Sequence, residues 1–357
     1  MTILLSPGPV PVLEEIRMAQ TKEMITHRSK EMSALYDDVA GRFRNYVNAD
    51  TSYMITGSGA LGLETLILNI CKKDEKAICF PNGEFGNKMV LTADVHTNTD
   101  PQEIEGGKGW NLERAKEALD NSDAQVMICV YNETGYGIKN DIKDMCRYAK
   151  SKGMFTIVDA ISAWPGTPMD MKEFSIDGFV TGSQKGIGAP PGIALLGLSN
   201  DAVERFSARE DTPSYYMDLK RHKKRFDKDM QTPNTPAVTL FWALQEAFNV
   251  LDREGGIPSA VKRHEEAAAH VRKRLQEMGF GPTAEKGFES NTVTGFVCES
   301  PEQAKEIKDR LEKEFDVKIV GCRGVYKDNG LRIAHMGNFE ISWLDTCLDG
   351  IEKIIAK

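Results

Sequence analysis

A lysine in a short loop of small residues and prolines is the most chemically suggestive feature of the sequence. Lys185 lies in the segment 181–192, which has neither the helical nor the strand spacing of apolar residues. Upstream, the apolar run 156–158 ends in Asp159. A lysine amine can form a Schiff base with pyridoxal phosphate, and an acid can partner the pyridinium nitrogen of that cofactor. The two residues therefore indicate a pyridoxal phosphate site.

A glycine-rich turn, 57–62, adds a second chemical feature, because it joins a predicted strand to a helical run that reaches residue 71. Free backbone N–H groups at a helix start bind phosphate, and Ser58 would add a hydroxyl. The same letters match the dinucleotide fingerprint. However, the next strand ends in Pro81 and Asn82, without the acid that should hold a ribose. A phosphate cradle is the preferred interpretation, and an NAD-binding module or an empty turn is the alternative.

Three further residues follow or lie on predicted strands and could complete such a site. Phe85 follows a strand end and could stack on a flat ring. Thr134 follows the next strand, and Arg332 places a guanidinium on a short apolar strand, which suits carboxylate capture. Taken singly, each has an ordinary explanation: core packing for Phe85, a salt bridge for Arg332, a helix cap for Asp159 and solvent exposure for Lys185. Their joint occurrence carries the prediction.

Composition narrows the class of protein. The 357 residues include 45 basic and 53 acidic side chains, a net charge of -8, which gives no support for nucleic acid or anionic membranes as partners. We find no apolar run of membrane-spanning length and no signal peptide. The seven cysteines are scattered, without a Cys-x-x-Cys pair, and are interpreted as reduced thiols rather than disulfides or a metal site. We therefore expect a cytoplasmic protein.

The elements that must position these residues form an α/β pattern. Between residues 50 and 200, short apolar runs alternate with helical stretches such as 111–119 and 141–150, which predicts a mostly parallel sheet covered by helices. The predicted strands are 53–55, 77–80, 126–130, 155–158, 178–180 and 193–196. Prolines should keep segment 6–9 extended. We expect an N-terminal arm at 1–15, a large cofactor-binding domain at 16–250 and a small α+β domain at 251–357.

The last 120 residues show a different pattern. We expect helices at 238–251 and 259–278, a strand at 292–297, a helix at 301–314, short strands at 317–320 and 331–334, and a helix from 340. His264 and His270 lie on a helix rich in charged residues and are predicted to be at the surface. The basic run 220–225 is interpreted as a solvated face, because acids follow at positions 227 and 229.

The chain resembles the class V aminotransferases of the alanine–glyoxylate and serine–pyruvate branch, which are fold-type I pyridoxal phosphate enzymes. The resemblance runs from segment 4–9 to segment 331–337, and it is most specific at 182–185 and 189–192. It departs from the family at Ala60, where some members carry histidine, and at 131–137, which lacks the usual Ser-Thr-Gly ending.

The resemblance implies roles for individual residues. Lys185 would carry the Schiff base and Asp159 would bind the ring nitrogen, while Arg332 would bind the substrate carboxylate beneath a lid around Gly8. The phosphate would be held by Ser58, Gly59, Ala60 and Gln184, and the ring by Phe85, Ile161 and Thr134. Thr232 and Thr235 would reach the phosphate of a neighbouring subunit, which implies a homodimer with shared sites. His27 and Arg28 match a pair that reaches the substrate phosphate in phosphoserine aminotransferases.

The expected activity is therefore amino transfer from serine or alanine to glyoxylate or pyruvate by a ping-pong mechanism, with Lys185 moving the Cα proton. We expect amino acid and keto acid substrates and no metal ion. Two alternatives on the same fold stay open. One is a phosphoserine or aspartate aminotransferase. The other is a lyase similar to cysteine desulfurases, for which Cys322 would have to carry the sulfur.

Overall fold

A seven-stranded sheet forms the centre of the larger part of the molecule. The computed structural model describes residues 2–211 and 214–356. The strand order is β2-β10-β9-β8-β5-β3-β4, and only β10 runs antiparallel to its neighbours in this sheet. The strands are β2 (Thr51–Thr56), β3 (Lys76–Phe80), β4 (Asn98–Pro101), β5 (Val126–Val130), β8 (Phe155–Asp159), β9 (Gly178–Gly182) and β10 (Ile193–Leu198). The predicted mostly parallel sheet is confirmed.

Helices cover both faces of this sheet, and this explains why its strands lack strict alternation. In β5, Met127 and Cys129 face one hydrophobic core, whereas Val126, Ile128 and Val130 face the other, and all are buried. The first core is closed by α2 (Lys30–Val47), α5 (Leu112–Asn121), α6 (Ile142–Ser151) and α10 (Val238–Arg253). The second is closed by α3 (Gly59–Ile70), α4 (Glu84–Asp94), α8 (Asn200–Ser207) and α9 (Leu219–Asp229).

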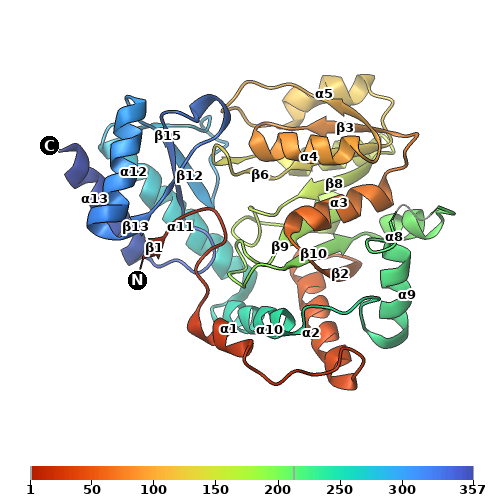
Figure 1. Cartoon of the computed structure of the whole chain (residues 1–357). Coiled ribbons are helices and arrows are strands. Elements are labelled where there is room, and N and C mark those ends of the chain that lie inside the picture. Colours follow the sequence, from red (N-terminus) through yellow and green to blue (C-terminus); the bar gives the residue numbers. More distant parts are fainter. Residues whose placement is uncertain (1, 212–213, 357) are drawn as a thin grey trace.

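A smaller antiparallel sheet lies beside the large one, in the blue part of Figure 1. Its order is β11-β12-β15-β14, formed by β11 (Gly281–Pro282), β12 (Val293–Val297), β15 (Gly330–Ala334) and β14 (Val320–Gly321). It packs with α11 (Gly256–Glu277), α12 (Pro301–Phe315) and α13 (Ile341–Ile355). Helix α11 contributes Ala260 to a large-sheet core and Ala267 to the small-sheet core. The domain boundaries near residues 15 and 250 remain predictions.

The N-terminal segment connects these two parts. β1 (Ile3–Leu4) pairs in parallel with β13 (Val317–Lys318), so the red start of the chain lies among the blue elements in Figure 1. The prediction that segment 6–9 is extended is wrong, because the chain bends there. Gly8 has a φ of 95°, and its N–H donates to the Ser6 carbonyl at 2.7 Å. Beyond the bend, the Val10 N–H donates to the Gln184 carbonyl at 3.2 Å, so the arm runs against the Lys185 loop.

Two surface predictions need correction. His264 is fully buried, because α11 packs between the two cores, and its ring lies edge-on to Phe339. Burial lowers its pKa to about 4. The basic run on α9 is only partly solvated, since its His222 is 3% exposed. His270 is half-buried and lies 2.7 Å from an Asp345 oxygen.

The remaining elements are short. They are α1 (Glu14–Ala19), β6 (Asn132–Glu133), β7 (Ile138–Lys139), α7 (Met171–Phe174) and a 3-10 turn at Gly324–Tyr326. In the ranges 2–211 and 214–356, none of the helices has the length and apolar character that crossing a membrane requires.

Candidate active site

A cavity of about 770 Å³ brings most of the predicted site residues together. Its wall combines the carboxyl end of β8, the start of α3, the Lys185 loop, the bend at 6–9 and the segment from β14 to β15. The predicted residues that line it are Gly8, Ser58, Ala60, Phe85, Thr134, Asp159, Ile161, Gln184, Lys185 and Arg332. Residues from 8 to 332 therefore meet in one cavity, which the parallel sheet and the smaller sheet close from two sides.

Lys185 lines the cavity, and its amine donates to the Pro7 carbonyl of the arm. Gly8 has a φ of 95°, which favours glycine, and a Cβ at this position would lie 2.6 Å from the Lys185 Cδ, so glycine suits the close approach of the arm. Burial lowers the pKa of Lys185 to about 8; Asp159 raises it, and the charge of Arg332 lowers it further. At pH 7 a lysine with this pKa has roughly a tenth of its amine in the neutral form, far more than an ordinary lysine, and only the neutral form can act as a nucleophile or base.

Asp159 ends β8 and is 8% exposed. Its Oδ1 accepts the Ile161 N–H at 2.9 Å, whereas no residue in the described part of the chain donates to Oδ2. Burial raises its pKa to about 6, partly offset by the Ile161 N–H and by Lys185. A protonated pyridinium nitrogen would give this carboxylate both a donor and a positive charge, so Asp159 fits the predicted cofactor.

The start of α3 provides the donors that a phosphate group needs. Ser58 precedes the helix, and its hydroxyl caps no backbone N–H. The first N–H groups of a helix have no acceptor within it, and the helix dipole favours an anion there. Gly59 faces Ile161, where a Cβ would come within 2.8 Å of that side chain. The buried Gln184 Oε1 also lacks a partner among the described residues. This end of the cavity therefore fits the phosphate of the cofactor.

Thr134 belongs to a small hydrogen-bond network that the sequence did not reveal. Its hydroxyl donates to Ser162 Oγ at 2.6 Å, and Ser162 Oγ donates to the Asn132 carbonyl at 2.9 Å. The Asn132 amide also donates to Ser162 Oγ at 2.8 Å. The network directs the Thr134 proton away from the ligand, which leaves its hydroxyl oxygen as an acceptor for a ring hydroxyl.

Glu133 is a second residue that sequence reasoning missed. This carboxylate is fully buried, and its Oε2 accepts the N–H groups of Phe85 at 3.0 Å and Gly86 at 2.9 Å. Its Oε1 accepts the Gly135 N–H at 2.7 Å. Burial raises its pKa, which these N–H groups oppose. Glu133 thus ties the start of α4, which carries Phe85, to the turn that carries Thr134. Only its position beside Thr134 could have drawn attention to it.

Arg332 is 4% exposed and is oriented entirely by carbonyl groups. Its Nε and Nη2 donate to the Gly321 carbonyl at 2.9 and 2.6 Å, and its Nη1 donates to the Thr134 carbonyl at 2.7 Å. Throughout residues 2–211 and 214–356, no carboxylate forms an ion pair with it, so the salt bridge considered from the sequence is not found. Burial lowers its pKa. An oriented, unneutralised guanidinium on the cavity wall is suited to a carboxylate ligand.

Four of the predicted residues lie away from the cavity of their own chain. Arg28 donates to the Thr232 carbonyl at 2.7 Å and to the Pro233 carbonyl at 3.2 Å. The Thr232 hydroxyl donates to the Asn234 carbonyl at 2.6 Å, and Thr235 is exposed. His27 precedes Arg28 and is half-buried. These residues form a second polar cluster, and the structure does not join it to Lys185.

The chain is similar to known aminotransferases in sequence and in fold. The family model for aminotransferase class V matches residues 12–320. An uncharacterized aminotransferase of Methanocaldococcus jannaschii is 33% identical over 340 residues, covering 94% of this chain and 88% of the relative. An alanine–glyoxylate aminotransferase of Oryctolagus cuniculus is 26% identical, with 94% and 87% covered. The solved alanine–glyoxylate aminotransferase of Nostoc superimposes with a TM-score of 0.93 at 22% identity, covering 99% of this chain and 95% of that one.

Proposed function

The chain belongs to the class V aminotransferases, and we propose that it moves an amino group from a small amino acid to glyoxylate or pyruvate by a ping-pong mechanism. The cofactor is pyridoxal 5′-phosphate. One observation carries the proposal: Lys185 and Asp159 line the same cavity, and burial shifts the pKa of each toward its neutral form. Paired shifts of this kind mark groups that exchange protons or bind a charged partner during a reaction.

The cofactor, bound through Lys185, supplies an electron sink for the negative charge that develops at the amino acid Cα. The residues of the chain provide the rest. Asp159 would keep the ring nitrogen of the bound cofactor protonated, and the neutral Lys185 amine would move the Cα proton. Arg332 orients the substrate by its α-carboxylate. Held in this way, Cα stays within reach of the Lys185 amine.

The remaining cofactor contacts are assigned by the same proposal. The α3 N-terminus would hold the phosphate together with Ser58, Gly59, Ala60 and Gln184. Phe85 and Ile161 would pack on opposite faces of the ring, and Thr134 would accept from the ring hydroxyl. The arm at Gly8 would limit the access of water, because it already lies against Lys185. Hydrolysis of intermediates outside the productive cycle would be slowed in this way.

A homodimer forms part of the proposal. Thr232, Thr235, His27 and Arg28 lie outside the cavity of their own chain, although the resemblance gives them cofactor and substrate roles. A twofold partner would reconcile both observations, because the cluster of one subunit could then complete the cavity of the other. Sedimentation of the purified protein would test this, and a monomer with full activity would contradict it.

The lyase alternative is less well supported. A sulfur-carrying cysteine must be accessible and readily deprotonated. Cys322 is 4% exposed, its thiol donates to the Leu331 carbonyl, and burial raises its pKa to about 12. Release of sulfide from cysteine by the purified enzyme would nevertheless revive this alternative.

The test of the proposed function is an absorption spectrum of the purified protein with pyridoxal phosphate. We expect a visible cofactor band that an amino donor converts to a near-ultraviolet band and that a keto acid restores. Lys185→Ala should lose this band and all steady-state turnover, whereas Lys308→Ala, on the exposed side of α12, should keep both. Substantial turnover in folded Lys185→Ala protein would overturn the proposal.

A further inference from the structure

The charges on the cavity wall exceed what the proposed reaction needs. Basic side chains line the cavity at Lys88, Lys185, Arg323, Lys327 and Arg332, whereas Asp159 is the one acidic side chain among its lining residues. In a confined space, such an excess of one sign favours ligands of the opposite sign. The cofactor phosphate and the substrate α-carboxylate account for part of this charge, and the remainder needs its own explanation.

Three of the five cations already have a partner or a role. Lys88 pairs with Glu84 at 3.2 Å. Lys185 binds the cofactor under the proposed function, and Arg332 binds the α-carboxylate. In the described part of the chain, no carboxylate forms an ion pair with the other two, Arg323 and Lys327. The cavity therefore keeps two positive charges after the cofactor and an ordinary small amino acid have been accommodated.

Arg323 is placed beside the residues that hold Arg332. It lies two positions after Gly321, whose carbonyl accepts from Arg332, and its own N–H donates to the Gly135 carbonyl at 3.2 Å. Gly135 in turn follows Thr134, the second carbonyl partner of Arg332. The charge of Arg323 contributes to the lowered pKa of Arg332, after burial, so the two guanidinium groups are close enough to interact.

Surface arginines are common, and exposure of Arg323 alone would mean little. The difference here is that two guanidinium groups share one cavity wall and neither forms an ion pair with a carboxylate in the described part of the chain; the charge of the buried Glu133 acts on Arg332 less than the charge of Arg323 does. Like charges held close together raise each other's energy, and an anion that contacts both relieves this. The α-carboxylate of alanine or serine can satisfy only one of them.

We propose that Arg323 determines substrate specificity by binding a second anionic group on the side chain of the amino donor, with Lys327 beside it. The enzyme then prefers amino acids whose side chain carries a carboxylate or a phosphate over alanine and serine. This inference rests on the proposed amino transfer and narrows its donor. Alanine and serine, the donors that the resemblance implies, become the slower substrates.

The test uses the holoenzyme and follows loss of the visible cofactor band with alanine, serine, aspartate, glutamate and phosphoserine separately. We expect at least one anionic donor to react with a second-order rate constant 10-fold or more above those of alanine and serine, on the order expected for one charge-assisted contact. A faster reaction with aspartate or glutamate would indicate that Arg323 binds a carboxylate. A faster reaction with phosphoserine would indicate that it binds a phosphate.

Arg323→Gln should lower that rate constant roughly 10- to 100-fold for the preferred anionic donor, chiefly through the apparent donor affinity, because one charge-assisted contact is lost. The rate constant for alanine should change far less. Arg323→Lys should recover part of the loss, because the charge returns without the planar fork. Arg310→Gln makes the same charge change on α12, outside the cavity, and serves as the matched control.

Two results would overturn the inference while leaving the proposed function intact. One is an alanine or serine rate equal to or above those of all three anionic donors. The other is an Arg323→Gln variant, with a normal cofactor band, that slows every donor equally. If no donor at all changes the cofactor band of the unmodified enzyme, the proposed function itself fails, and this inference fails with it.

Discussion

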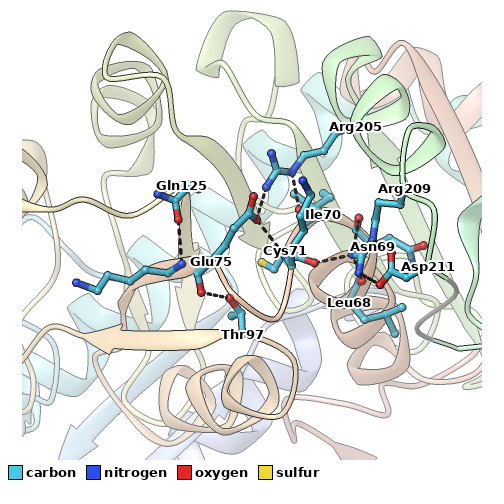
Figure 2. Close-up of polar contacts among 12 residues, drawn as sticks. Leu68, Asn69, Ile70, Cys71, Glu75, Thr97, Gln125, Arg205, Arg209 and Asp211 are labelled. Carbon is cyan, nitrogen blue, oxygen red and sulfur yellow. Dashed lines mark hydrogen bonds and ion pairs between the residues drawn. The ribbon is translucent and has the colours of Figure 1, made fainter.

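The two ends of helix α3 are treated in opposite ways. At its start, Ser58 leaves the first N–H groups uncapped, and this end faces the cavity. At its end, two arginines from α8 and the segment that follows it satisfy the carbonyl groups, as Figure 2 shows. Both ends of any helix begin with unpaired backbone groups. The comparison indicates that the backbone N–H groups without a partner beside the cavity are available to a ligand, whereas the carbonyl groups that already accept hydrogen bonds stabilise the fold.

At the C-terminal end of α3, which we call the saturated end, Arg209 and Arg205 donate to the backbone carbonyl groups. Arg209 Nη1 donates to the carbonyls of Leu68 at 2.6 Å, Asn69 at 3.2 Å and Cys71 at 2.6 Å. Arg205 donates to the Ile70 carbonyl and to Glu75. Cations at a helix C-terminus also interact favourably with its dipole. None of these contacts reaches the cofactor site, which lies about 18 Å away along the twelve residues of α3.

Placing a negative charge at the open end should give the largest effect. Ala60 is exposed in the first turn of α3, so Ala60→Asp should fold, and the helix dipole should stabilise the apo protein by up to about 1 kcal/mol. The same carboxylate should repel the cofactor phosphate and weaken pyridoxal phosphate binding roughly 100-fold or more. Titration of the cofactor band measures this. Ala60→Asn is the neutral control of equal size, and equal losses in both variants would refute the electrostatic explanation.

Removing a donor from the saturated end should have the opposite effect, because it should lower stability and leave cofactor affinity nearly unchanged. Arg209→Met removes the donor shared by three carbonyls from a side chain that is 6% exposed, and we expect it to lower the free energy of unfolding by about 2–4 kcal/mol. Cofactor affinity of the folded protein should hardly change, because the two sites are far enough apart to act independently. Denaturant unfolding and cofactor titration give the two numbers. Arg209→Lys keeps the charge and should lose less stability, and a large fall in cofactor affinity would break the comparison.

Glu133 offers a further test of this comparison, because it lies beside the cavity and yet both of its oxygens already accept hydrogen bonds. Glu133→Gln replaces one acceptor oxygen with a donor that would face a backbone N–H, so we expect a loss of about 1–3 kcal/mol in unfolding free energy. Since Glu133 positions Phe85, the variant should also shift the cofactor absorption band and lower the rate of amino transfer. Glu84→Gln makes the same change at a half-exposed residue of α4, the helix that carries Phe85, and is the matched control. An unchanged band with lowered stability would limit Glu133 to a structural role.

The same contrast explains what the sequence could predict. The strands around β5, the Lys185 loop and the α3 start are local patterns, and the structure places them as expected, so the α/β fold follows from sequence. Contacts between residues far apart in the sequence could not be predicted from such local patterns. His264 looks like a surface residue by its charged neighbours, yet it is buried because α11 serves two cores. Arg209 and Glu133 form hydrogen bonds with segments far from them in sequence. The position of a polar residue in the sequence does not indicate which distant segment it will contact.

The pH dependence of stability distinguishes the two ends of α3 by sign. Burial raises the pKa of Asp159 in the cavity to about 6 from 3.8, so folding favours its protonated form. Stability of the apo protein should therefore rise as pH falls through 6 toward 4, by at most about 3 kcal/mol for this residue.

At the other end of α3, Arg209 lowers the pKa of the exposed Asp211, so its small contribution is present above pH 3.8 and is lost as pH falls further. Of Asp159 and Asp211, only Asp159 should titrate between pH 4 and 6. Asp159→Asn should abolish that part of the slope, and so should saturating cofactor, whose ring nitrogen would hold the carboxylate in its charged form. An unchanged slope in Asp159→Asn would mean that the cavity does not penalise the Asp159 charge, and the contrast between open and saturated ends would then rest on hydrogen bonding alone.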